Sequence, residues 1–82
     1  MLASKNSLAE RKIIRTSMPG RIIKVLEKEG SEIKAGQPVI ILEAMKMHNE
    51  IRAPFAGEVK QLLVESGQHV TKNQLLVEVV PS

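Results

Sequence analysis

Hydrophobic residues occur along the chain in short segments, separated every six to ten residues by glycine, proline or asparagine. The segments are rich in valine and isoleucine, a composition typical of strands joined by turns. The apolar residues do not keep the three- and four-residue spacing of an amphipathic helix. The pattern therefore predicts an all-β protein.

The chain contains an internal repeat with a shift of 37 residues, which superimposes Gly20 on Gly57 and Gly30 on Gly67. The same shift places apolar residues on apolar residues: Ile22 on Val59, Val25 on Leu62, Leu26 on Leu63, Ile33 on Val70, Val39 on Leu76, Ile40 on Val77 and Leu42 on Val79. One half is too short to bury its own apolar face, so the repeat predicts two interlocked copies around a pseudo-twofold axis. A duplication without functional content explains the repeat equally well.

Comparing the two copies indicates which residues face the core. Ile41 corresponds to the charged Glu78, so this position faces outward. Because strand side chains alternate between the two faces, the neighbouring positions are predicted to be buried. They are Ile40, Leu42, Val77 and Val79.

The alternation of apolar residues slips after Ile22 and again after Val59. Because both copies slip alike, we expect a β-bulge in each of these strands. Turns that need a positive φ are predicted at Gly30 and Gly67, and at the pairs Ala35 with Gly36 and Lys72 with Asn73.

With 82 residues, a mass of 9.1 kDa and 43% hydrophobic residues, the chain has material for one compact core. Residues 1–12 are mostly polar and lack strand periodicity, so we expect a flexible tail or linker there and a single domain over residues 13–82. A transit peptide is the alternative for the tail, which is short for that purpose and contains Glu10.

Composition also narrows the environment and the partners. The chain has no cysteine for disulfides or thiolate metal sites, and its longest apolar run, Val39 to Leu42, is far below the roughly 20 residues of a spanning helix. We expect an intracellular protein without membrane insertion, in the cytoplasm or, in a eukaryote, the mitochondrial matrix. The net charge of +3 is spread along the chain and Phe55 is the single aromatic residue, so we expect no nucleic-acid binding.

The first copy ends near Glu43 and the second begins near Pro54. Between them, Met45 and Lys46 occupy the centre of a predicted two-residue hairpin, which joins strands at Val39 to Ala44 and Met47 to Arg52. Asparagine or glycine is the usual choice where such a turn needs a positive φ. Methionine and lysine there indicate that the side chains matter more than backbone ease. A single lysine on a turn is otherwise an ordinary solvated residue.

The residues Glu43, Ala44, Met45, Lys46 and Met47 match the attachment motif of biotinyl carrier domains, and the chain resembles a biotin carboxyl carrier domain over residues 16–80. Other matching segments are Met18 to Gly20, Lys28 to Gly30, Ala35 to Pro38, Asn49 to Ile51, Ala53, Pro54 and Gly57. Ser17 and His48 depart from the common family pattern. The resemblance implies a flattened β-barrel sandwich of two quasi-symmetric four-stranded antiparallel sheets, with the chain ends opposite Lys46.

The resemblance also implies a function. Lys46 would carry covalent biotin, attached by a biotin protein ligase that recognises Glu43, Ala44, Met45 and Met47. The biotin would shuttle a carboxyl group between a biotin carboxylase and a carboxyltransferase, and the isolated domain would be a monomer. The short segment from Val25 to Gly30 has no room for the thumb loop of some bacterial acetyl-CoA carboxylase carriers. This points to carriers of pyruvate, propionyl-CoA or methylcrotonyl-CoA carboxylases, biotin-dependent decarboxylases, or small free-standing carriers.

We expect no catalytic residues and no metal site, and hence a carrier that is not itself an enzyme. His48 and His69 stand alone, and the chain has no aspartate for a catalytic triad. Two alternatives remain open. A lipoyl carrier would share the fold and the exposed lysine, although acidic and small residues usually flank that lysine instead of Met45 and Met47. An unmodified barrel-sandwich adaptor would make Lys46 incidental.

Overall fold

The computed structural model describes residues 10–82, which form eight strands and no helix. In order, the strands are β1 (Lys12–Arg15), β2 (Gly20–Val25), β3 (Glu32–Ile33), β4 (Pro38–Ala44), β5 (Met47–Arg52), β6 (Gly57–Leu62), β7 (His69–Val70) and β8 (Leu75–Pro81). Within this range there is accordingly no helix that could cross a membrane. The all-β prediction is confirmed.

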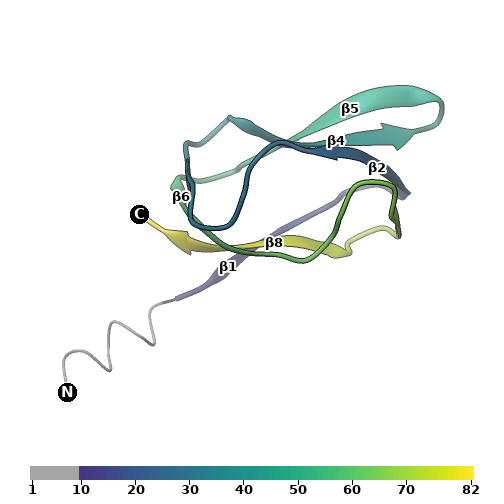
Figure 1. Cartoon of the computed structure of the whole chain (residues 1–82). Helices are drawn as coiled ribbons and strands as arrows, with labels where there is room; N and C mark the ends of the chain where they lie inside the picture. Colours follow the sequence, from purple (N-terminus) through teal and green to yellow (C-terminus); the bar gives the residue numbers. More distant parts are fainter. Residues whose placement is uncertain (1–9) are drawn as a thin grey trace, which may run out of the picture.

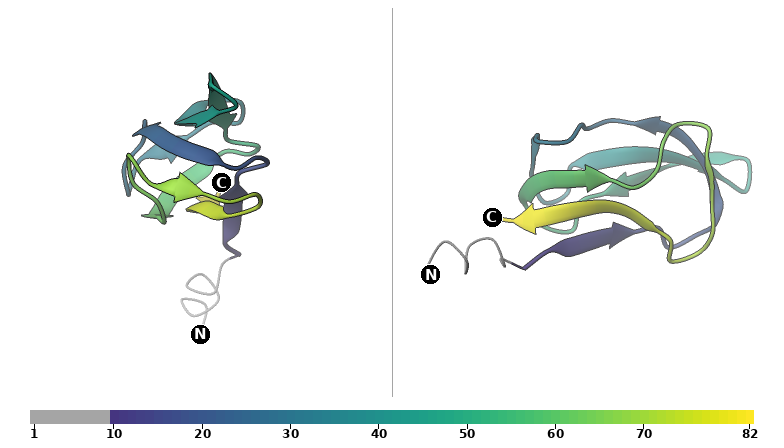
Figure 2. Two further views of the ribbon diagram at one scale, coloured as in Figure 1. Left: turned by 90° about the vertical axis from the view of Figure 1, so that its right-hand side faces the viewer. Right: turned by 60° about the horizontal axis from the view of Figure 1, so that its bottom comes forward.

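The strands form two four-stranded antiparallel sheets, one in the order β1-β8-β6-β3 and the other in the order β5-β4-β2-β7. Figure 2 shows the two sheets packed against each other, and Figure 1 shows the β4–β5 hairpin at the opposite end from the C-terminus. Lys12 in β1 pairs with Val79 in β8, so β1 begins beside the end of β8. This is the flattened sandwich that the resemblance implied.

The 37-residue repeat extends over all eight strands. It carries β1 onto β5, β2 onto β6, β3 onto β7 and β4 onto β8, and it converts the strand order of one sheet into that of the other. The sequence placed the start of the second copy near Pro54, and this was wrong, because the second copy begins with β5. Between β1 and β5 the repeat retains little besides Ile14 with Ile51 and Arg15 with Arg52, which is too little to show in the sequence.

The core lies between the two sheets and consists of isoleucine, valine, leucine and alanine side chains. The four residues predicted to be buried, Ile40, Leu42, Val77 and Val79, are at most 1% exposed. Ile41 and Glu78 face outward and are half-buried. The predicted facing is therefore confirmed. Each fully buried side chain of this size contributes about 1.5–3 kcal/mol to stability.

Both predicted bulges are present. The pairing register shifts between Ile22 and Lys24 in β2, and between Val59 and Gln61 in β6. The extra residues are therefore Ile23 and Lys60, which the repeat superimposes. The predicted turns also have positive φ, at Gly30, Gly36, Gly67 and Asn73.

Loops of each half bind the bulged strand of the other half. The amide of Gly30 donates to the carbonyl of Val59 at 2.8 Å, and the amide of Gly67 donates to the carbonyl of Ile22 at 2.7 Å. These two bonds are equivalent under the repeat. They interlock the halves, as the repeat predicted.

Most of the predicted tail, residues 1–12, lies outside the described residues. Of its last residues, Arg11 forms an ion pair with Glu78 at 3.1 Å, and Lys12 opens β1. The Lys12 amine also lies 5.6 Å from the centre of the Phe55 ring, a cation–π distance. The described residues just before Ile13 are thus in contact with the sandwich.

Candidate functional site at the β4–β5 hairpin

Two residues, Met45 and Lys46, join β4 to β5, and Ala44 pairs with Met47 to close the hairpin. Their φ angles are 53° and 67°, in the left-handed region that a type I′ turn needs at both central positions. The predicted hairpin is confirmed. A left-handed backbone costs an ordinary side chain roughly 1–2 kcal/mol per residue. Backbone stability therefore does not explain why methionine and lysine are found here.

The turn presents its side chains to solvent. Met45 is 91% exposed and Met47 is 64% exposed, and Lys46 between them is exposed too. The hydrogen bonds and ion pairs found within residues 10–82 do not include the Lys46 amine. Another protein can therefore reach the amine without breaking a hydrogen bond or ion pair of residues 10–82, and two apolar thioethers flank it.

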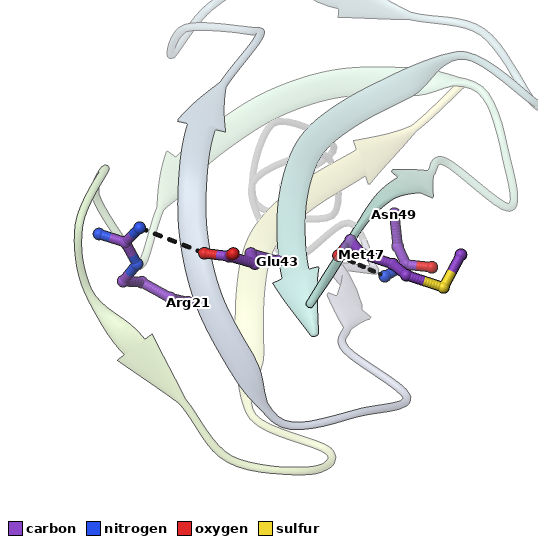
Figure 3. A network of polar contacts seen from close by, with 4 residues as sticks. All are labelled: Arg21, Glu43, Met47 and Asn49. Atoms are coloured by element: carbon purple, nitrogen blue, oxygen red, sulfur yellow. Dashed lines mark hydrogen bonds and ion pairs between the residues drawn. The ribbon is translucent and has the colours of Figure 1, made fainter. Parts of the chain in front are cut away.

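The two residues before the turn lie on opposite faces of β4. Ala44 is 5% exposed, and its methyl group packs in the core beneath the hairpin. Glu43 faces outward, where its carboxylate accepts a hydrogen bond from Arg21 Nη2 at 3.2 Å (Figure 3). This partly exposed pair is worth about 0.2–1 kcal/mol. Its main effect is to hold the Glu43 carboxylate over β2.

The five motif residues thus lie in three different places in the structure. Met45, Lys46 and Met47 are brought together at the exposed tip, whereas Ala44 is buried in the core beneath it. Glu43 lies at the base of the hairpin, on its outer face.

Three further residues support the hairpin. Arg21 was missed by the sequence argument, because it becomes a partner of Glu43 only in the β2–β4 register. Asn49 donates from Nδ2 to the carbonyl of Met47 at 3.1 Å (Figure 3). Gly20 lies so close to β4 that a Cβ there would overlap the Glu43 carbonyl oxygen. Its repeat partner Gly57 has the same relationship with the Val80 carbonyl. The recurrence of glycine at these two positions was therefore the signal in the sequence that could have identified the close approach of the strands.

The two histidines lie in one row across the outer face of this sheet. His48 pairs with Glu43, Glu43 with Arg21, and Arg21 with His69 in the strand register. Both imidazoles are exposed. Among residues 10–82, no group of three histidine, cysteine, aspartate or glutamate side chains is arranged to hold a metal ion.

Known proteins share this fold and this sequence. The model of the biotin-requiring enzyme family matches residues 12–79. A biotin carboxyl carrier protein of Streptococcus mutans is 48% identical over 62 residues, which are 76% of this chain and 48% of that protein. The pyruvate carboxylase of Bacillus subtilis is 42% identical over 66 residues, which are 80% of this chain and 6% of the enzyme.

A solved structure, described as a single-chain, multi-domain long-chain acyl-CoA carboxylase, superimposes with a TM-score of 0.83 at 30% identity. The match covers 88% of this chain and 7% of that one. This chain therefore spans less than half of the carrier protein and a small part of each carboxylase. The exposed amine at the hairpin fits the amide linkage that covalent biotin requires. The chain belongs to the biotin-requiring enzyme family, as a carrier of covalently attached biotin of the kind found in biotin-dependent carboxylases.

Proposed function

We propose that Lys46 is the residue to which biotin is attached, and that the domain presents this residue to other enzymes without catalysing a reaction itself. One observation carries the proposal: Lys46 is exposed at the tip of a two-residue hairpin, at a positive φ of 67°, inside the motif Glu43 to Met47. The fold holds the backbone of the turn in place and leaves the amine exposed.

A free carboxylate does not acylate an amine in water, because its oxygen is a poor leaving group. The acyl group must therefore arrive activated, and we assign that step to a biotin protein ligase. After losing a proton, Lys46 Nζ attacks the acyl carbonyl of biotinyl adenylate. The new amide bond forms as the bond to AMP breaks, and AMP leaves. The formal charge of the chain falls from +3 to +2.

Once bound, biotin carries a carboxyl group on a ureido nitrogen. The role of this chain is to tether the biotin and to orient it. The sandwich places the tip of the hairpin at the opposite end of the domain from the start of β1 and the end of β8 (Figure 1). The unbranched Lys46 side chain extends the reach, so one attachment point can serve two active sites at a high effective concentration. We assign those sites to a biotin carboxylase and a carboxyltransferase, and the second of these would choose the acceptor.

The flanking residues favour biotin over lipoate. Met45 and Met47 place an apolar thioether on each side of Lys46, whereas acidic and small residues are expected beside a lipoyl lysine. The proteins named above as similar are a biotin carrier and two carboxylases, which agrees with this choice.

The proposal is tested by incubating the chain with a biotin protein ligase, ATP and biotin, followed by intact mass measurement and peptide mapping. The expected result is one biotinyl group, on the peptide that contains Lys46. A parallel incubation with a lipoate ligase and lipoate should give no addition. Biotin on another lysine, lipoate in place of biotin, or no addition at all would contradict the assignment.

A further inference from the structure

An open groove of about 760 Å³ lies on the outer face of the sheet that carries the hairpin. It runs over β2, β4 and β5. Its floor contains two half-buried isoleucines, Ile23 and Ile41, and its rim consists of polar residues. The main rim residues are Lys24, His48, Glu50 and Arg52.

The bulge in β2 shapes the floor. Ile22 pairs with Leu42 and points into the core, and the next paired residue is Lys24, opposite Ile41. Ile23 is the extra residue, so Ile23 and Lys24 both line the groove instead of alternating between the faces. On the other side, Ile41 pairs with Glu50 in β5.

The other half of the molecule shows what the fold requires at these positions. The repeat superimposes Ile23 on Lys60, Lys24 on Gln61 and Ile41 on Glu78. β6 forms the same bulge with Lys60 as the extra residue, and Glu78 is held by Arg11 at 3.1 Å. The same backbone geometry therefore forms with the polar residues Lys60, Gln61 and Glu78 at these positions. The bulge and the sandwich therefore do not account for isoleucine at positions 23 and 41.

The charges around the groove are unevenly matched. Glu50 forms an ion pair with Arg52, and Glu43 forms one with Arg21 at 3.2 Å. Among the ion pairs within residues 10–82, none involves Lys24. The unmatched charge on the rim is therefore positive. A surface that fits would offer an apolar side chain to the isoleucines and a carboxylate to Lys24.

The ligase needs features besides an exposed lysine on a turn. Lys12, Lys28, Lys34, Lys60 and Lys72 are exposed too. Lys72 even lies on a tight turn, next to Asn73 with a φ of 67°. Lys46 differs from these lysines because it lies on the β4–β5 hairpin, and β4 and β5 also form part of the groove.

We propose that this groove is a docking site for the biotin protein ligase, which contacts Ile23 and Ile41 with an apolar side chain and Lys24 with a carboxylate. The inference rests on the proposed attachment at Lys46. It adds a second point of recognition behind the tip, which fixes the orientation of the hairpin in the ligase active site.

The test exchanges the two outer faces. The variant I23K/K24Q/I41E gives the groove the residues of its repeat counterpart. We expect the KM of the ligase for this variant to rise at least tenfold, with kcat within twofold of the original chain. The reciprocal variant K60I/Q61K/E78I makes the same exchange on the other sheet and should leave both constants unchanged. Thermal unfolding of each variant checks that the fold is retained.

Several outcomes would overturn the proposal. An unchanged KM in I23K/K24Q/I41E would show that the ligase does not use the groove. A lower kcat at unchanged KM would assign these residues to hairpin geometry instead of docking. Concentration-dependent dimerisation of the original chain, lost in the variant with no change in KM, would assign the groove to a second copy. If the original chain takes no biotin at Lys46, the proposed function itself fails, and this failure is visible before any variant is made.

Discussion

Gly20 in β2 lies directly against the backbone carbonyl of Glu43 in β4, at a distance that leaves no room for a side chain at position 20. Gly20→Ala should therefore push β2 away from the base of the hairpin and lower the free energy of unfolding by about 1–3 kcal/mol. Urea titration followed by circular dichroism measures this change.

Gly57→Ala is the matched control for Gly20→Ala, because a Cβ at Gly57 would overlap the Val80 carbonyl in the same way. Both variants should lose similar stability, but only Gly20→Ala should slow loading with biotin, since only Gly20 supports the hairpin. Equal loading rates in the two variants would show that the hairpin does not depend on this contact.

Lys46→Arg keeps the positive charge and removes the primary amine. Because the Lys46 side chain is exposed and no hydrogen bond or ion pair within residues 10–82 involves it, the unfolding free energy of the variant should differ by less than about 0.5 kcal/mol. Biotin incorporation, measured by intact mass, should fall to zero. Lys72→Arg changes another exposed lysine on a tight turn and should load normally. Biotin on another lysine of the Lys46→Arg variant would refute the hypothesis that the position of Lys46 at the hairpin tip selects it for modification.

Met45 has a φ of 53°, which asparagine adopts more readily than methionine. Met45→Asn should therefore raise the unfolding free energy by up to about 1 kcal/mol. The same change should lower kcat/KM for loading, since an exposed apolar flank is lost. Met47→Asn lies in β5 outside the positive-φ turn, so it should reduce loading without the gain in stability. A Met45→Asn variant that is no more stable would mean that the turn carries no backbone cost.

Ile40 and Ile41 are neighbours on opposite faces of β4. Ile40→Ala should cost about 2–5 kcal/mol, because the Ile40 side chain is fully buried in the core. Ile41→Ala removes a half-buried side chain on the outer face and should cost about 1 kcal/mol or less. Chemical denaturation of the pair measures the difference, and equal losses would contradict the facing of β4.

The repeat in the sequence predicted much of this fold because two copies reveal constraints that one copy hides. Ile41 set against Glu78 marked the outward positions, and the shared slip after Ile22 and Val59 marked the bulges. The hairpin at Met45 and Lys46 followed from the strands on each side. In each case the local backbone conformation, whether strand, bulge or turn, determined which residue types occur there.

The pairing and register of strands that are distant in the sequence could not be predicted from the residue types. Nothing in the residues of β1 shows that it pairs with β8, and the Arg21–Glu43 pair needs the register of β2 against β4. The groove over Ile23 and Ile41 was likewise hidden, because a bulge changes which side chains share a face. The burial of Ala44 also became visible only in the structure, where Ala44 is 5% exposed and its neighbour Met45 is 91% exposed.

The pairing of β8 with β1 repeats the pairing of β4 with β5, but only the second pair is joined by a turn. A symmetric pair of unlinked half-chains would contain the same strand pairs, but the positions of Met45 and Lys46 would then be chain ends. Covalent fusion of the halves is what creates the tip. Because Met45 and Lys46 close one of the two equivalent ends, the otherwise near-symmetric body has a distinct hairpin end and therefore a defined front and back.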